Sequence, residues 1–159
     1  MSDAVSVEVV EAVAADDIQA ARELFLDYGR SLGFSLSFQG FDEELATLPG
    51  KYVLPAGRIL LARVNGSVAG VVAVRPLESG ICEMKRLYVR PGHRGLNVGR
   101  LLARAIIGTA QELGYRAMRL DTLNSMTAAM SLYRSLGFRE IPPYCDNPIP
   151  GAVYFERTL

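Results

Sequence analysis

The residues with the clearest capacity for chemistry follow an apolar stretch near the middle of the chain. They read Arg94-Gly95-Leu96-Asn97-Val98-Gly99, and the pattern after them predicts a helix that continues through 101–113. At a helix start the first backbone N–H groups have no partner within the helix, and the helix dipole adds partial positive charge. Glycines at 95 and 99 let a ligand approach the backbone, and Arg94 and Arg100 add charge. The loop therefore predicts an anion site suited to a pyrophosphate.

Composition excludes several classes of protein. The 159 residues are 50% hydrophobic and carry a formal net charge of zero, which predicts one folded domain over 1–159 and argues against a nucleic-acid binder. The N-terminus lacks the pattern of a signal peptide, and no apolar run reaches the roughly 20 residues that cross a membrane. Cys82, Cys145 and the single histidine, His93, are not spaced as metal ligands. We expect no metal and no membrane partner, and two free thiols favour a cytoplasmic location.

Apolar periodicity and turn residues predict a mixed α/β fold with the order β-α-α-β-β-β-α-β-α-β. Asp16 and Asp17 are expected to cap the first helix, and Asn65-Gly66 predicts a hairpin. The helix that starts at the loop should lead by a right-handed crossover into a parallel strand at 117–121. The expected strands are 5–10, 58–64, 68–74, 81–89, 117–121 and 152–158, and the other expected helices are 16–28, 41–48 and 125–136.

The loop and its surroundings resemble the GNAT family of N-acetyltransferases. The family signature Gln/Arg-x-x-Gly-x-Gly/Ala has its counterpart in 94–99, with Asn97 in place of the central glycine. The preceding Leu87-Tyr88-Val89-Arg90-Pro91 and the later Asn124, Tyr133 and Gly137-Phe138 also stand where the family has them. Asn is the residue other than glycine that most readily takes left-handed backbone angles, so the loop shape should be kept. The resemblance implies the GNAT fold, a mostly antiparallel sheet with helices on both faces.

The resemblance also implies acetyl-CoA as co-substrate and an amine as acceptor. Loop amides would hold the pyrophosphate, and the backbone of 87–89 would pair with the pantetheine arm and supply an oxyanion donor from Val89 or Leu87. Asn124 would either cap the next helix or bind the coenzyme amide. The implied coenzyme-binding residues are Leu87, Tyr88, Val89, Arg94, Gly95, Leu96, Asn97, Val98, Gly99, Arg100, Asn124 and Tyr133.

Two catalytic residues follow from the same resemblance. Tyr133 is the expected general acid for the departing thiolate, since a phenol with a pKa of about 10 is protonated at neutral pH. The alternative is a core tyrosine at helical spacing. Glu83, in phase with Lys85, Leu87 and Val89 on its strand, is the expected base, and the alternative is a glutamate that pairs with a neighbouring cation. Tyr144 and Asp146 are the other candidates for the base.

The acceptor pocket is expected from segments with little regular structure and from nearby basic residues. A basic side chain in this pocket would favour an amine that also bears a carboxylate. A protein or peptide acceptor and a non-catalytic acyl-CoA sensor are the alternative functions, and the sequence leaves a homodimer open. The candidate acceptor-binding residues are Phe38, Tyr52, Arg75, Lys85, Tyr144 and Asp146, and for Phe38 and Tyr52 the alternative is a role in the core.

Overall fold

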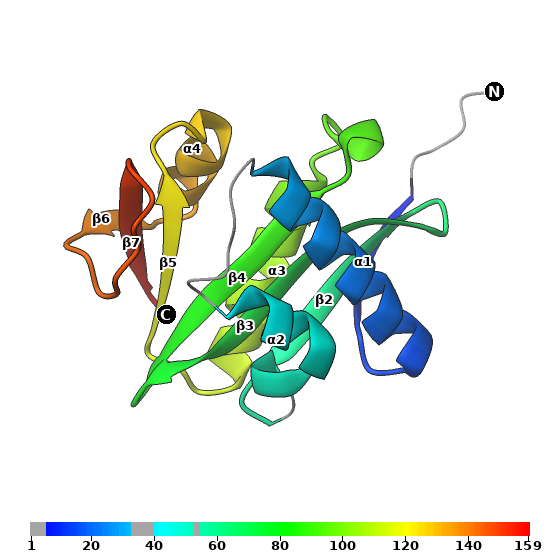
Figure 1. The fold of residues 1–159 in the computed structure, drawn as a ribbon, viewed down its shortest axis with the longest axis horizontal. Coiled ribbons are helices and arrows are strands. Elements are labelled where there is room, and N and C mark those ends of the chain that lie inside the picture. The colour runs from blue at the N-terminus through cyan, green and yellow to red at the C-terminus, as the bar shows by residue number, and fades with distance from the viewer. Residues whose placement is uncertain (1–5, 33–39, 53–54) are drawn as a thin grey trace.

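The computed structural model describes residues 6–32, 40–52 and 55–159, which form one seven-stranded sheet in the order β1-β2-β3-β4-β5-β7-β6 (Figure 1). Phe38 lies outside the described residues. The strands are β1 (Val7–Glu11), β2 (Arg58–Val64), β3 (Ser67–Glu78), β4 (Ile81–Val89), β5 (Ala117–Leu123), β6 (Arg139–Ile141) and β7 (Ala152–Thr158). The helices are α1 (Ala15–Ser31), α2 (Phe41–Thr47), α3 (Val98–Glu112) and α4 (Thr127–Ser135), with short 3-10 turns η2 (Gly50–Tyr52) and η3 (Pro91–His93).

Strands β4 and β5 form the parallel pair of an otherwise antiparallel sheet. Their pairing covers Ile81–Glu83 against Ala117–Arg119, at the beginning of both strands. Beyond these residues the two strands diverge toward α4 (Figure 1). The mixed α/β fold and the parallel crossover predicted from the sequence are confirmed, and the divergence opens the middle of the sheet.

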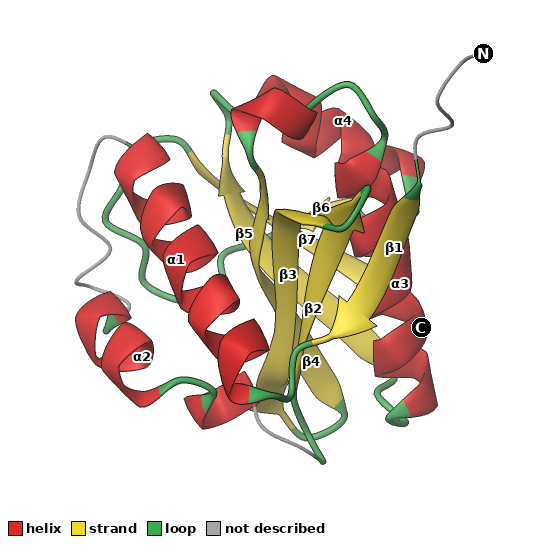
Figure 2. Cartoon of the chain, turned by 90° about the vertical axis from the view of Figure 1, so that its right-hand side faces the viewer, coloured by secondary structure: helices red, strands yellow, loops and turns green. Residues whose placement is uncertain are grey.

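Helices cover the sheet on both faces (Figure 2). Helix α3 packs on one face, where Leu102 and Ile106 are fully buried, and α1 and α2 lie on the other, where Leu24 and Phe25 are fully buried. The periodic apolar residues of each helix form a single stripe, and burial of each large side chain contributes about 1.5–3 kcal/mol. The face of α1 and α2 also carries the charged side chains that matter for the site.

Two expected helix caps differ in the structure. Helix α1 begins at Ala15 with Ala14 as its N-cap, so Asp16 and Asp17 stand in the first turn, where they favour the helix dipole. Asp17 also binds Arg63 of β2 at 2.7 Å, which ties the helix start to the sheet. At α4, a turn closed by the Met126 amide and the Leu123 carbonyl (2.9 Å) delays the helix, so Met126 and not Asn124 is the N-cap.

Strand β6 is absent from the sequence-based prediction. It contains three residues, none of them buried, and it lies at the edge of the sheet beside β7. Three residues give no measurable alternation of apolar and polar side chains, so β7 supplies the pairing that defines this strand.

Candidate active site

The loop before α3 has the backbone shape that an anion site requires. Asn97, at the N-cap, adopts left-handed angles with φ 65°, and Gly95 has φ 86°. The first bond of the helix joins the Leu101 amide to the Asn97 carbonyl at 3.1 Å. The amides of the first turn therefore have no carbonyl partner within the helix. An Asn in place of the signature's central glycine is thus compatible with this loop.

Two residues of the loop are arranged to leave room for a ligand. A Cβ placed on Gly99 would meet only Val89 Cγ2, at 3.7 Å, so the space in front of the helix start is open. Arg94 is fixed beside it, since its Nε donates to the Val89 carbonyl at 3.1 Å and its guanidinium lies 5.8 Å from the Tyr88 ring centre. The helix start and the arginine together fit a pyrophosphate.

A β-bulge changes which way the residues of β4 face. Arg86 has φ 62°, and both Arg86 and Leu87 stand opposite one residue of β3, because Lys85 pairs with Ala73 and Tyr88 with Val71. Lys85, before the bulge, shares the face of Glu83, and the bulge places Arg86 on that face too, against Glu44 of α2. Leu87 packs against the core on the α3 face, as does Val89. The expected common phase of Glu83, Lys85, Leu87 and Val89 is therefore wrong, because the bulge inserts one extra residue.

A cavity of about 970 Å³ lies where β4 and β5 diverge. It is large enough for a coenzyme-sized ligand. It extends from the helix-start loop along β4 to the end of β5 and the beginning of α4. Leu96 and Asn124, both expected to bind the coenzyme, are not among the described residues that line it. The lining includes Tyr28, Leu32, Lys85, Arg86, Leu87, Tyr88, Val89, His93, Arg94, Gly95, Asn97, Val98, Gly99, Arg100, Asp121, Asn147 and Tyr133.

Tyr133 of α4 both packs in the core and lines the cavity. Its ring lies edge-on to Phe138 with centroids 5.9 Å apart, and the residue is 7% exposed. Burial, with a smaller contribution from Tyr28 and Asp121, raises the pKa of Tyr133 above its usual 10.0. Its hydroxyl makes no hydrogen bond to any described residue. A phenol held protonated beside the cavity is suited to donate a proton to a thiolate.

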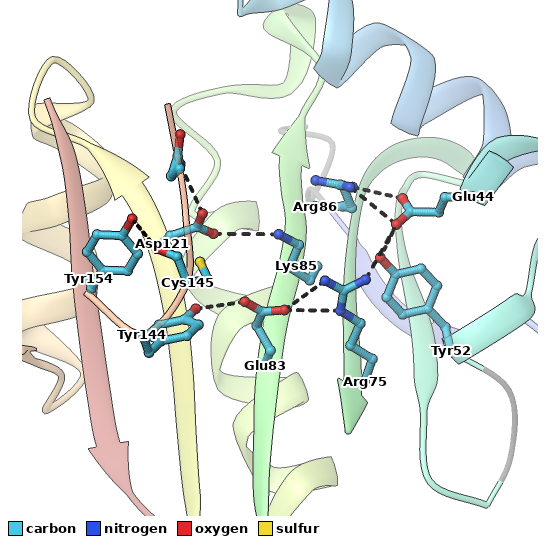
Figure 3. Close-up of polar contacts among 11 residues, drawn as sticks. Glu44, Tyr52, Arg75, Glu83, Lys85, Arg86, Asp121, Tyr144, Cys145 and Tyr154 are labelled. Carbon is cyan, nitrogen blue, oxygen red and sulfur yellow. Dashed lines mark hydrogen bonds and ion pairs between the residues drawn. The ribbon is translucent and has the colours of Figure 1, made fainter. Parts of the chain in front are cut away.

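Glu83 belongs to a buried network on the α1 and α2 face of the sheet (Figure 3). Its Oε1 accepts from Arg75 Nε at 3.0 Å, and its Oε2 accepts from the Tyr144 hydroxyl at 2.7 Å. Glu83, Arg75 and Tyr144 are not among the described residues that line the cavity. Glu83 is 3% exposed, so two partners satisfy a carboxylate that is otherwise shielded from water. The contacts correspond to the pairing alternative considered for this glutamate.

The same network continues to α2 through Glu44 (Figure 3). Arg86 donates to both oxygens of Glu44, from Nε at 2.9 Å and from Nη2 at 3.2 Å. The Tyr52 hydroxyl donates to Glu44 Oε1 at 2.7 Å, and the Tyr52 ring packs edge-on against Phe25. Tyr52 is thus a core residue that also holds the network, and it is not in the described lining of the cavity.

Lys85 and Asp121 bring opposite charges into the cavity. Lys85 Nζ lies 3.5 Å from Asp121 Oδ1, and the two side chains are 5% and 8% exposed. The Asn147 side-chain amide donates to Asp121 Oδ2 at 3.1 Å. Burial lowers the pKa of Lys85, although Glu83 and Asp121 act in the opposite direction. Of the two acidic residues expected near the acceptor, Glu83 and Asp146, neither lines the cavity, and Asp146 is exposed.

Sequence reasoning missed Asp121 and Tyr28. It expected the turn at 144–147 in the acceptor pocket but selected Tyr144 and Asp146 from it, not Asn147. Asp121 is the one acidic residue in the sequence of β5, AMRLDTL, so its side chain was a signal that the sequence contained. Asp121 lines the cavity only because β5 diverges from β4, and no local sequence pattern indicates that divergence. Asn147 lies one residue from Asp146, and only the folded path of the segment decides which of the two faces the cavity.

Two further site types are absent from the described residues. These residues contain no group of three or more His, Cys, Asp or Glu side chains that is able to hold a metal ion. In the same part of the chain, no helix combines the length and apolar character needed to span a membrane.

Similarity to known proteins identifies the family of this chain. The model of the Acetyltransferase (GNAT) family matches residues 18–138, which is most of the chain. The chain belongs to the GNAT family. Membership identifies it as an acetyl-CoA-dependent N-acetyltransferase, as the resemblance of the loop implied.

Individual relatives support this assignment. An uncharacterised N-acetyltransferase of Schizosaccharomyces pombe is 46% identical over 145 residues, which cover 90% of this chain and 89% of the relative. An IAA acetyltransferase of Azospirillum brasilense is 35% identical over 107 residues, covering 66% of this chain and 70% of the relative. The PaiA N-acetyltransferase of Thermoplasma acidophilum, solved in complex with coenzyme A, superposes with a TM-score of 0.73 over 97% of this chain and 99% of its own. At 16% identity this last match concerns the fold alone.

Proposed function

We propose that this GNAT enzyme transfers the acetyl group of acetyl-CoA to the primary amine of a small molecule, by direct attack within a ternary complex. The observation that carries the proposal is the continuity of the cavity. One end is the helix-start loop, which fits the pyrophosphate, and another part contains the buried pair Lys85–Asp121. A coenzyme and an acceptor can therefore meet in one space without the protein carrying the acetyl group between them.

The oxyanion and the departing thiolate each have a candidate donor in the cavity. The amine nitrogen attacks the thioester carbonyl, a C–N bond forms, and the amides of β4 near Leu87–Val89 are the proposed donors to the oxyanion. The C–S bond then breaks, and the sulfur takes the proton of Tyr133. The proton lost by the amine passes to a carboxylate or to water. Glu83 stays a prediction for this base.

Burial of Lys85 and Asp121 in the cavity favours a small acceptor. Lys85 and Asp121 are each less than a tenth exposed, so an acceptor that touches them must enter between β4 and β5. A compact amine can do this with little rearrangement, whereas a lysine on a protein surface must reach past the rim of the cavity. The proposal therefore ranks small amines above polypeptides, and the cytoplasmic location stays a prediction.

Initial-rate kinetics test the proposal. Thiol release from acetyl-CoA is measured with a panel of amino acids, polyamines, aminoglycosides and peptides, and both substrates are then varied for the best acceptor. Direct attack predicts double-reciprocal lines that intersect. Parallel lines would indicate an acetylated enzyme, turnover of peptides alone would indicate a polypeptide acceptor, and tight acetyl-CoA binding without turnover of any amine would indicate a sensor.

A further inference from the structure

The Lys85–Asp121 pair lines the cavity but has no role in the steps of acetyl transfer described above. We infer that the acceptor is zwitterionic, with a carboxylate close to its amine, and that Asp121 binds the ammonium group while Lys85 binds the carboxylate. The inference rests on the proposed function, because it specifies the class of small amine. The residues that carry it are Lys85, Asp121 and Asn147, all of which line the cavity.

The spacing of the two charges matches that of an α-amino acid. Lys85 Nζ and Asp121 Oδ1 are 3.5 Å apart. In an α-amino acid, bonds of about 1.5 Å on either side of Cα place the nitrogen and the carboxylate oxygens about 3 Å apart. A zwitterion laid against the pair brings its ammonium to the aspartate and its carboxylate to the lysine. The four charges then alternate in sign, which is the favourable arrangement.

Two neighbouring arginines, Arg86 and Arg75, are less suited to bind the acceptor than the Lys85–Asp121 pair. Arg86 also lines the cavity, but it gives two hydrogen bonds to Glu44, and its guanidinium lies 5.0 Å from the Phe41 ring centre. Arg75 gives its bonds to Glu83 outside the described lining of the cavity. These two arginines are held against α2 or β4 by bidentate or paired contacts, which fixes them as structural charges.

Because Lys85 is buried, an acidic ligand beside it is favoured over a neutral or basic one. A charge removed from water is costly unless opposite charges surround it. Burial lowers the pKa of Lys85, although Glu83 and Asp121 act in the opposite direction. A ligand carboxylate beside Lys85 would favour its charged form, and a second ammonium group in the same place would disfavour it. Asn147 holds Asp121 through Oδ2, which leaves the aspartate oriented toward the lysine and the cavity.

The test uses acceptors that differ only in the group beside the amine. The wild-type enzyme is assayed with alanine, alaninamide, ethylamine and 1,2-diaminopropane, and with the corresponding sets that carry larger side chains. The expected kcat/KM for the free acid exceeds that for the matched amide by about 10²-fold, and the diamine is the poorest acceptor. Equal rates for acid and amide, or a preference for the diamine, would overturn the inference.

Variants of the two lysines assign the preference to Lys85. The chain has two lysines, and Lys51 is exposed, so Lys51→Met is a matched control for Lys85→Met. In Lys85→Met, kcat/KM for the free acid divided by kcat/KM for the matched amide should fall to within a few-fold of one. In Lys51→Met this ratio should stay at the wild-type value. Lys85→Arg, which keeps the charge, should retain a preference for the acid. A Lys85→Met ratio equal to that of the wild type would overturn the inference.

Asp121→Asn separates the two halves of the pair. Its kcat/KM should fall for acid, amide and simple amine alike, because all of them present an ammonium group. If Lys85→Met does not fold, the wild-type ratio and Lys85→Arg still decide the matter, and unfolding curves identify that case. A wild type that acetylates peptides but no small amine overturns the proposed function itself. A wild type that acetylates small amines without regard to the carboxylate overturns only this inference.

Discussion

Gly99→Glu places a carboxylate at the proposed pyrophosphate site without disturbing the fold. Gly99 is the second residue of α3, and a Cβ there meets one atom at the ordinary contact distance of 3.7 Å. Removing a helical glycine and adding an acidic residue to the first turn both stabilise a helix, together by up to about 1 kcal/mol. The free energy of unfolding should therefore rise slightly or stay the same.

Coenzyme affinity should change in the opposite direction. A carboxylate about 5 Å from a phosphate charge costs about 3 kcal/mol at an effective dielectric constant of about 20. This corresponds to a loss of about 10²-fold in Kd, before any steric conflict is counted. Isothermal titration with acetyl-CoA measures the affinity, and urea unfolding measures the stability.

The matched control is Gly108→Glu. Gly108 lies in the same helix and has open space around it, but it stands more than two turns from the loop. The Gly108→Glu variant should bind acetyl-CoA with the affinity of the wild type. The reasoning is refuted if folded Gly99→Glu binds acetyl-CoA as tightly as Gly108→Glu.

Three further predictions concern the buried titratable residues. Tyr133→Phe should lower kcat by about 10²–10⁴-fold, which is the usual effect of losing a positioned proton donor. Its stability at neutral pH should change little. A kcat within a few-fold of the wild type would contradict the general-acid role. Burial raises the pKa of Tyr133, so the folded protein keeps a proton that the unfolded chain loses above about pH 10. Stability should therefore decline as the pH rises beyond that value, by about 1.4 kcal/mol per pH unit for this tyrosine. Urea unfolding should find a shallower decline in Tyr133→Phe, and an identical slope would contradict a raised pKa of Tyr133. Glu83→Gln should destabilise the protein by about 1–3 kcal/mol, because Arg75 and Tyr144 lose a charged partner. If Glu83 is also the base, the acid limb of the kcat/KM profile flattens, and an unaltered limb argues against that role.

The parts of the fold that local chemistry determines were predictable from the sequence. The Asn65-Gly66 turn, the strand at 152–158 and the helix-start loop each have a signal within a few residues, and the structure has a hairpin, a strand and a helix start there. Asn97 is a clear case, since its tolerance of left-handed angles is a property of the residue alone. Its φ of 65° requires no tertiary contact to explain it.

The remaining features depend on pairings between distant segments. The bulge at Arg86 exists because β3 has one residue fewer than β4 over this stretch, and no pattern within β4 indicates it. The bulge in turn decides that Leu87 faces the core on the α3 side, whereas Lys85, which precedes the bulge, shares the face of Glu83. Asp121 enters the cavity because β4 and β5 separate after Glu83, which is a property of the whole sheet.

The most direct measurement of the central claim follows the acetyl group itself. Wild-type enzyme is incubated with acetyl-CoA that carries an isotopic label in the acetyl group and with the best small amine, and the products are analysed by mass spectrometry beside a thiol assay. The account predicts a labelled amide on the amine nitrogen and one free CoA thiol for each amide formed. CoA release without labelled amide, or label found only on the protein, would contradict it.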